Sequence, residues 1–175
     1  MTAQLSITAD NQRRVWVNGQ QVEWTGNEWH QATRLQVPLF RHPERENVVA
    51  VLATNLSSQA GLDRGLLADV RWNGALLLTN AQWKQQSALD GGWNENDPAW
   101  RTPGFNDSSW PNARQQAGNG AQPWGTVLLV HSNASWIWSY FSDAPGKPDI
   151  EPVFFRRRFY IDVNGAFVDT PTQCP

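Results

Sequence analysis

The stretch LSITADNQRRVWVNGQQVE, Leu5–Glu23, decides the fold because it combines two strand patterns with a polar corner and a tight turn. Apolar and polar residues alternate over Leu5–Ala9, as in a strand that is buried on one face. Asp10-Asn11 interrupts the pattern with side chains that favour turns, and the β-branched and aromatic run Val15–Val17 resumes it. Asn18-Gly19 predicts a two-residue hairpin. The stretch therefore predicts an antiparallel β module.

Strand patterns continue along the chain at a spacing of roughly ten residues, which is typical of a sandwich or barrel. Asn47–Asn55 is so rich in β-branched residues that we expect it at the centre of a sheet. Asn73-Gly74 predicts a second hairpin turn. The remaining predicted strands are Arg34–Phe40, Leu66–Trp72, Leu76–Thr79, Asn80–Lys84 and Val153–Ile161.

The middle of the chain differs from both ends, because it is rich in Trp, Asn, Gly and Pro and poor in β-branched residues. Asp90–Pro123 is expected to form a long ordered loop with helical turns, such as one over Ser108–Ala117. We predict an all-β jelly-roll sandwich with a long Trp-rich loop segment. One domain would span residues 1–161, with residues 162–175 as a tail or truncated linker.

Composition excludes several classes of function. With a net charge of −2 and few clustered cations, the 175-residue chain has no basic field for nucleic acid. No 18-residue apolar run exists to span a membrane, and no signal-peptide pattern follows Met1. Cys174 alone cannot form an intrachain disulfide or a cysteine zinc site. A secreted location is favoured, and a cytoplasmic one stays open.

Tryptophan is unusually frequent, with 11 Trp against 2 Tyr and 1 Met. Most of these side chains are expected in the core, where their size fills the space between sheets. A few could stand on the surface as flat platforms, since a Trp face binds the apolar face of a sugar ring at low entropic cost. The abundance of Trp suits a sugar-binding protein, but it does not distinguish core side chains from surface platforms.

Several segments together resemble one family. In order, these are ADN…VWVNG, a loop Trp, ENVVAVLATN, GLLADV, NAQWKQQ and PGFNDSSWPNA. The set resembles the galactose-binding-like modules of bacterial α-L-rhamnosidases, in particular their rhamnose-binding modules. ASWIWSYFSDAPGKPDIEPVFFRRRFYI resembles the stretch that usually opens such a module. Here it comes last, so the strand order looks permuted, or the chain looks cut from a tandem array.

The resemblance implies a sugar site with a nearby calcium ion, made by Asp10, Asn11, Trp29 and Asn55. Carboxylate and amide groups suit vicinal hydroxyls, and Ca²⁺ prefers oxygen ligands. From their position in the next loop, Asp63 and Arg64 could reach the same end of the sandwich. Each residue also has a structural interpretation: the first pair as turn chemistry, Trp29 as a loop anchor and Asn55 as a strand cap.

We therefore predict a non-catalytic carbohydrate-binding domain, or lectin, that recognises a terminal rhamnose or galactose-type sugar, with neighbouring domains or a second copy as further partners. The first alternative is a spacer module of a larger carbohydrate-active protein that binds no sugar. The second is a small hydrolase that uses acids of the middle segment. Those acids occupy positions typical of turns, so we expect no enzyme activity.

Overall fold

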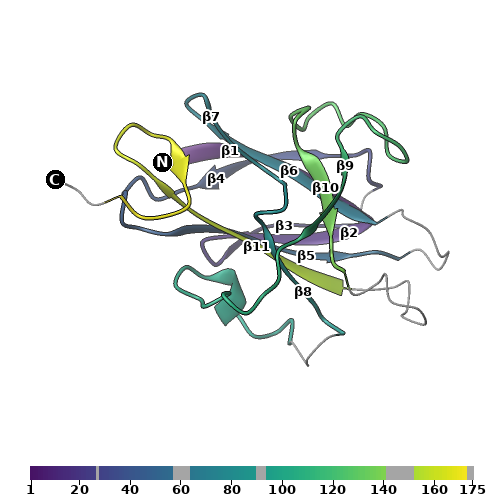
Figure 1. Cartoon of the computed structure of the whole chain (residues 1–175), viewed down its shortest axis with the longest axis horizontal. Helices are drawn as coiled ribbons and strands as arrows, with labels where there is room; N and C mark the ends of the chain where they lie inside the picture. The colour runs from purple at the N-terminus through teal and green to yellow at the C-terminus, as the bar shows by residue number, and fades with distance from the viewer. Residues whose placement is uncertain (27, 57–63, 90–93, 141–151, 173–175) are drawn as a thin grey trace.

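A computed structural model describes residues 1–26, 28–56, 64–89, 94–140 and 152–172. Two antiparallel β-sheets pack face to face, as Figure 1 shows, so the predicted all-β sandwich is confirmed. The first sheet has the strand order β4-β1-β6-β10-β9, with β7 beside β6. Its strands are β1 Thr2–Asp10, β4 Thr33–Pro38, β6 Gly65–Trp72, β7 Ala75–Leu78, β9 Arg114–Gly118 and β10 Ser135–Trp138.

The second sheet has the order β12-β11-β5-β2-β3, with β8 beside β11. As predicted, the apolar strand β5 lies at its centre, between β11 and β2. The strands of this sheet are β2 Gln12–Val17, β3 Gln20–Thr25, β5 Asn47–Thr54, β8 Lys84–Ser87, β11 Pro152–Ile161 and β12 Phe167–Val168. Aliphatic and aromatic side chains of both sheets, such as Leu5, Val51 and Phe155, are fully buried between them.

Both predicted hairpin turns are present. Asn18 and Gly19 have φ angles of 53° and 84°, and Asn73 and Gly74 have 49° and 83°. Positive φ at both central residues is the geometry that matches the twist of the flanking strands, and Asn-Gly adopts it at low cost. These turns fix β2 against β3 and β6 against β7.

The half-buried pattern expected for β1 is wrong, because Ser6 and Thr8 are as inaccessible as the apolar residues between them. A cluster that includes Trp124 and Trp136 covers the outer face of the first sheet. A second cluster, centred on Trp100 and Phe154, covers part of the outer face of the second sheet. The Trp-rich connections thus bury both faces of strands that local alternation predicts to be half exposed.

Two further expectations in the middle segment are wrong. Asn80–Trp83 is a turn, and the strand begins only at Lys84. The predicted helical turn over Ser108–Ala117 instead leads into β9, which pairs with β10. The helical turn that does form is the short 3₁₀ helix η1, Ala99–Arg101. Among the described residues, no helix is long and apolar enough to cross a membrane.

The segment after Ile161 continues the fold beyond the predicted domain end. Tyr160 and Ile161 of β11 pair with β12, the short yellow strand in Figure 1. Phe167 contacts Phe159 edge to face, with ring centroids 5.2 Å apart. Asp162–Val168 therefore belongs to the sandwich rather than to a loose tail.

Candidate functional site

The predicted site residues come together where four strands begin or end. Asp10, at the end of β1, pairs with Gly65 at the start of β6. The Asn11 amide donates to the Thr54 carbonyl (3.1 Å), which places Asn11 beside the end of β5. We call Asp10, Asn11, Asn55 and Arg64 the loop end. The sixth predicted residue, Asp63, lies outside the described residues.

The polar groups of the loop end largely satisfy one another. The Trp124 indole Nε1 donates to Asp10 Oδ2 (3.0 Å), and Asn11 Nδ2 donates to Asp10 Oδ1 (2.7 Å). Asn11 Oδ1 accepts a hydrogen bond from the Leu56 amide (2.8 Å). Asp10 is only 4% exposed, and Asn55 and Arg64 are also buried. This network stabilises the corner itself, because buried polar groups without partners are costly.

Trp124 stacks on a second tryptophan in this corner, and the backbone passes close to both rings. The rings of Trp124 and Trp136 are nearly parallel, with centroids 4.5 Å apart. A Cβ atom at Gly65 would lie 2.5 Å from the Trp136 ring and 3.3 Å from Trp124. Glycine at position 65 therefore allows the strand to pass directly under the stack.

Trp29 reaches the same end of the sandwich but is partly buried. Its side chain packs against the cluster that contains Trp124 and Trp136. Its carbonyl accepts a 2.6 Å hydrogen bond from Thr8 Oγ1, and its ring meets His30 edge to face. These contacts match the loop-anchor interpretation at least as well as that of an open sugar platform.

The described residues form no cluster of acidic side chains at the calcium site that the resemblance implies. They contain no group of three or more Asp, Glu, His or Cys side chains that could hold a metal ion. Both carboxylate oxygens of Asp10 already accept hydrogen bonds from side chains. Calcium binding therefore stays a prediction.

An exposed tryptophan lies on the outer face of the second sheet, close to the loop end. Trp24 on β3 is 67% exposed, whereas seven of the ten described Trp are buried. The Arg14 guanidinium stacks over its ring at 4.7 Å from the centroid. A small polar pocket of about 50 Å³ adjoins the ring. Its lining residues, which we call the Trp24 surface, are Gln12, Arg13, Arg14, Trp24, Leu52, Thr54 and Glu95.

A β-bulge in the hairpin explains why Trp24 points outward. Val15 pairs with Glu23 and Trp16 with Gln21, so Val22 is an extra residue without a partner on β2. A bulge re-aims the side chains that follow it. Trp24 therefore shares the outer face with Arg14, while the Glu23 carboxylate turns back to the buried Arg13 guanidinium (2.8 Å). Strict alternation of inward and outward side chains, counted from Val22, would place Trp24 inside. The sequence pattern therefore does not indicate that Trp24 is exposed.

Cations and aromatic rings border the Trp24 surface. Arg101 of η1 lies over the Trp16 ring at 4.3 Å from its centroid. Burial lowers the pKa of Arg101, and the charge of Arg14 lowers it further, while Glu95 and Asp97 act in the opposite direction. The arginine stays charged, since its ordinary pKa is far above neutrality. The surface thus offers an aromatic face together with fixed hydrogen-bond donors.

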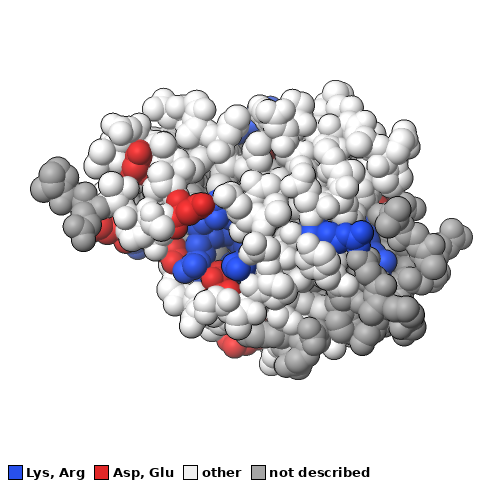
Figure 2. All heavy atoms as spheres, in the orientation of Figure 1, with Lys and Arg blue, Asp and Glu red and all other residues white. Residues whose placement is uncertain are grey.

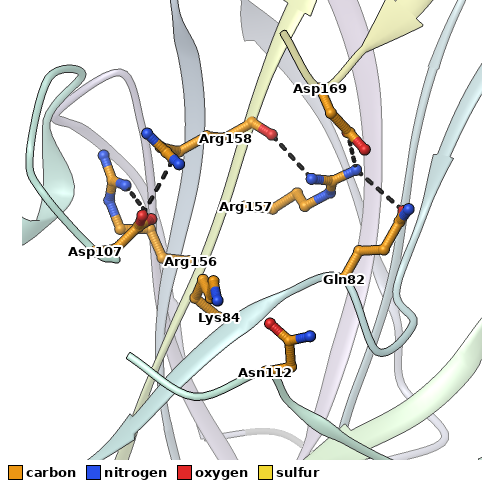
Figure 3. Close-up of a pocket in the computed structure, with 8 residues that line it drawn as sticks. All are labelled: Gln82, Lys84, Asp107, Asn112, Arg156, Arg157, Arg158 and Asp169. Atoms are coloured by element: carbon orange, nitrogen blue, oxygen red, sulfur yellow. Dashed lines mark hydrogen bonds and ion pairs between the residues drawn. The ribbon is translucent and has the colours of Figure 1, made fainter. Parts of the chain in front are cut away.

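A second hollow lies on the face drawn in Figure 2, where blue and red side chains gather left of centre. It has a volume of about 230 Å³. We call it the arginine groove. Its lining residues, all labelled in Figure 3, are Gln82, Lys84, Asp107, Asn112, Arg156, Arg157, Arg158 and Asp169.

The three consecutive arginines of β11 differ in role. Arg156 is fully buried and donates to Asp107, Glu46 and two backbone carbonyls. Arg158 is 46% exposed in its side chain and lies 3.1 Å from Asp107 Oδ1. Arg157 is buried and pairs with Asp169 (2.5 Å). Pairing with loops therefore dominates.

Comparison with known proteins gives one similarity. Over 144 residues the chain is 35% identical to an α-L-rhamnosidase of Streptomyces avermitilis, a match that covers 77% of this chain. The chain spans only 13% of the length of that relative. No family model and no solved structure matches the chain. The chain is thus similar to one segment of a carbohydrate-active enzyme.

Proposed function

We propose that this chain is a non-catalytic carbohydrate-binding module that recognises a terminal rhamnose or galactose-type sugar. The observation that carries the proposal is the exposed ring of Trp24 beside a small polar pocket. A flat, rigid aromatic face with hydrogen-bond donors at its edge suits the apolar face and the hydroxyls of a sugar ring. The similarity to part of a rhamnosidase supports carbohydrate as the ligand class.

The proposed site joins the Trp24 surface to the predicted loop end. Gln12 and Thr54 line the pocket, and they are the chain neighbours of Asn11 and Asn55. Asn11 is only partly buried, so its amide can contribute to a ligand next to Trp24. Asp10 acts behind it as a positioning residue, because it holds the Asn11 side chain through a 2.7 Å hydrogen bond.

The charges at the Trp24 surface support binding without catalysis. Glycoside hydrolysis uses a pair of carboxyl groups, one on each side of the scissile bond. Glu95 is the single carboxylate in the described lining of the pocket. The match to 13% of a much longer enzyme also agrees with an accessory role. A single weak site would gain avidity from a neighbouring domain or a second copy.

The test is a glycan array, followed by titration calorimetry with methyl α-L-rhamnoside and methyl β-D-galactoside. We expect binding of one sugar class, and we expect Trp24→Ala to weaken it at least tenfold, since stacking on the ring is lost. Leu128→Ala is the matched control, because Leu128 is 89% exposed and is not part of the Trp24 surface. Equal affinity in the two variants would reject the site.

Repeating the titration in EDTA tests the calcium prediction separately. Loss of binding in EDTA, restored by added Ca²⁺, would support a calcium-assisted site. Unchanged binding would keep the carbohydrate proposal and remove calcium from it.

A spacer module is the second candidate, and the loop end favours it. Asp10 is buried and hydrogen-bonded within the protein, and Trp29 is partly buried in an aromatic cluster. If folded protein binds no glycan on the array, the spacer function replaces the proposal.

A further inference from the structure

The arginine groove lies at a gap in the edge of the second sheet. On this edge β11 pairs with β8 as far as Arg156 and with β12 from Tyr160 onward. Among the described strands, none pairs with residues 157–159 of β11 on this edge. The gap exposes the groove floor, where Figure 3 shows Lys84 and Asn112 between Asp107 on one side and Gln82 on the other.

Arg157 carries a charge at a position that faces the core. Its strand neighbours of the same parity, Phe155 and Phe159, belong to the buried core. The Arg157 guanidinium extends outward at the gap and donates hydrogen bonds to Asp169, Gln82 and the Arg158 carbonyl. Its Nε atom is buried and has no hydrogen-bond partner among the described residues. A buried donor without a partner is costly, so the described residues compensate the burial of this side chain only in part.

The groove carries an excess of positive charge. Four cationic side chains line it, against the carboxylates of Asp107 and Asp169. Arg156 is neutralised by Asp107 and Glu46. In the described part of the chain, no carboxylate lies within ion-pair distance of the Lys84 ammonium. Arg158 shares Asp107 (3.1 Å) and Glu46 (3.8 Å) with Arg156, and its side chain is 46% exposed. The Lys84 ammonium and the exposed side of the Arg158 guanidinium can therefore meet an incoming anion.

Hydrogen-bond acceptors also line the groove, between these donors. This mixture favours a ligand that carries both an anionic group and donor groups. A bare inorganic anion would meet Asp169 and Asp107 without offering them a donor. A carboxylate that carries hydroxyl groups would offer its anion to the cations and its hydroxyls to Asp169, Gln82 and Asn112. The volume of about 230 Å³ is below that of pockets for drug-sized ligands and suits one sugar ring.

We propose that the arginine groove binds a uronic acid unit, with Lys84 and Arg158 on its carboxylate. The preference for a carboxylate rests on the groove alone, whereas a glycan as its source rests on the proposed function. The groove and the Trp24 surface share no lining residue, so the two sites can be tested apart.

The test is calorimetry with methyl β-D-glucuronide, its neutral counterpart methyl β-D-glucoside, and acetate. We expect the glucuronide to bind at least tenfold more tightly than either of the others, and more weakly as NaCl is raised. Lys84→Gln should weaken glucuronide binding about tenfold, since one charge-assisted contact is lost. Arg34→Gln is the matched control for loss of one charge, because Arg34 is exposed on β4 of the other sheet.

Equal binding of glucuronide and glucoside, or equal affinity in Lys84→Gln and Arg34→Gln, would overturn the proposal. Acetate binding as tightly as the glucuronide would overturn the uronate and leave a simple anion site. Trp24→Ala separates the two sites: it should weaken binding of the rhamnoside or galactoside at least tenfold and leave glucuronide affinity unchanged. Loss of glucuronide binding in Trp24→Ala would show that the groove is not an independent site.

Discussion

Two tryptophans near the same end of this sandwich each pair with a charged residue, in opposite ways. Trp124 is buried and uses the edge of its ring, donating through Nε1 to the Asp10 carboxylate. Trp24 is exposed and uses one face of its ring, which lies under the Arg14 guanidinium. The first arrangement satisfies a buried donor and a buried acceptor, whereas the second leaves much of an aromatic ring in water.

The difference distinguishes a structural tryptophan from the tryptophan that is proposed to bind a ligand. A Trp that has found a partner for its N–H inside the protein and a second ring to stack on has little left to offer a ligand. An exposed ring is hydrophobic surface that folding has not used. Exposure and orientation, rather than proximity to the predicted Asp-Asn corner, point to Trp24.

The largest expected effect on stability comes from truncating the buried ring of Trp124, and truncating the exposed ring of Trp24 is the comparison. Trp124→Ala should lower the free energy of unfolding by about 3–5 kcal/mol, because it leaves a cavity beside Trp136. Trp24→Ala should lower it by only about 0.5–1 kcal/mol, because the main loss is the exposed cation–π contact with Arg14. Urea unfolding followed by circular dichroism measures both. Similar losses in the two variants would contradict the distinction.

Asp10→Ala should have an intermediate effect on stability. It removes the acceptor of the buried Trp124 N–H, which we expect to cost about 1–3 kcal/mol. Asp10→Asn serves as the control, since its amide oxygen keeps an acceptor in place and should recover part of the loss. A variant Asp10→Ala as stable as the wild type, with sugar binding abolished, would instead make Asp10 a direct ligand.

Arg14→Gln should have the smallest effect. Loss of an exposed cation–π contact is expected to cost about 0.5–1 kcal/mol. The same change exposes the face of the Trp24 ring that Arg14 covers. Sugar affinity should therefore rise or stay constant, while the free energy of unfolding falls slightly. A tenfold loss of sugar affinity would show that the guanidinium itself contacts the sugar.

Local signals predicted the hairpins and the central strand, because these depend on residues close in sequence. Asn18-Gly19 and Asn73-Gly74 both adopt the positive φ angles that Asn-Gly favours. Strand β9 could not be predicted in the same way. Its sequence, RQQAG, has little strand character, and its conformation depends on pairing with β10, which begins only at Ser135.

The location of the candidate residues follows from the sequence, whereas their exposure does not. Asp10, Asn11 and Asn55 were predicted at one end of the sandwich, and the strand pairings place them there. Burial of Asp10 depends on Trp124, which lies 114 residues away, and no local pattern encodes that contact. The alternation of apolar and polar residues in β3 gave no sign of the outward turn of Trp24, because a single extra residue shifts the register.

The bulge at Val22 has a consequence for self-association. Among the described strands, β3 pairs only with β2, so its other edge offers unpaired backbone groups to a second molecule. Irregular twist and an inward-pointing charge are two means by which proteins prevent such edges from joining. The bulge supplies the first, and Glu23, bound to Arg13, supplies the second. The feature that presents an aromatic ring to solvent therefore also protects the protein against edge-to-edge aggregation.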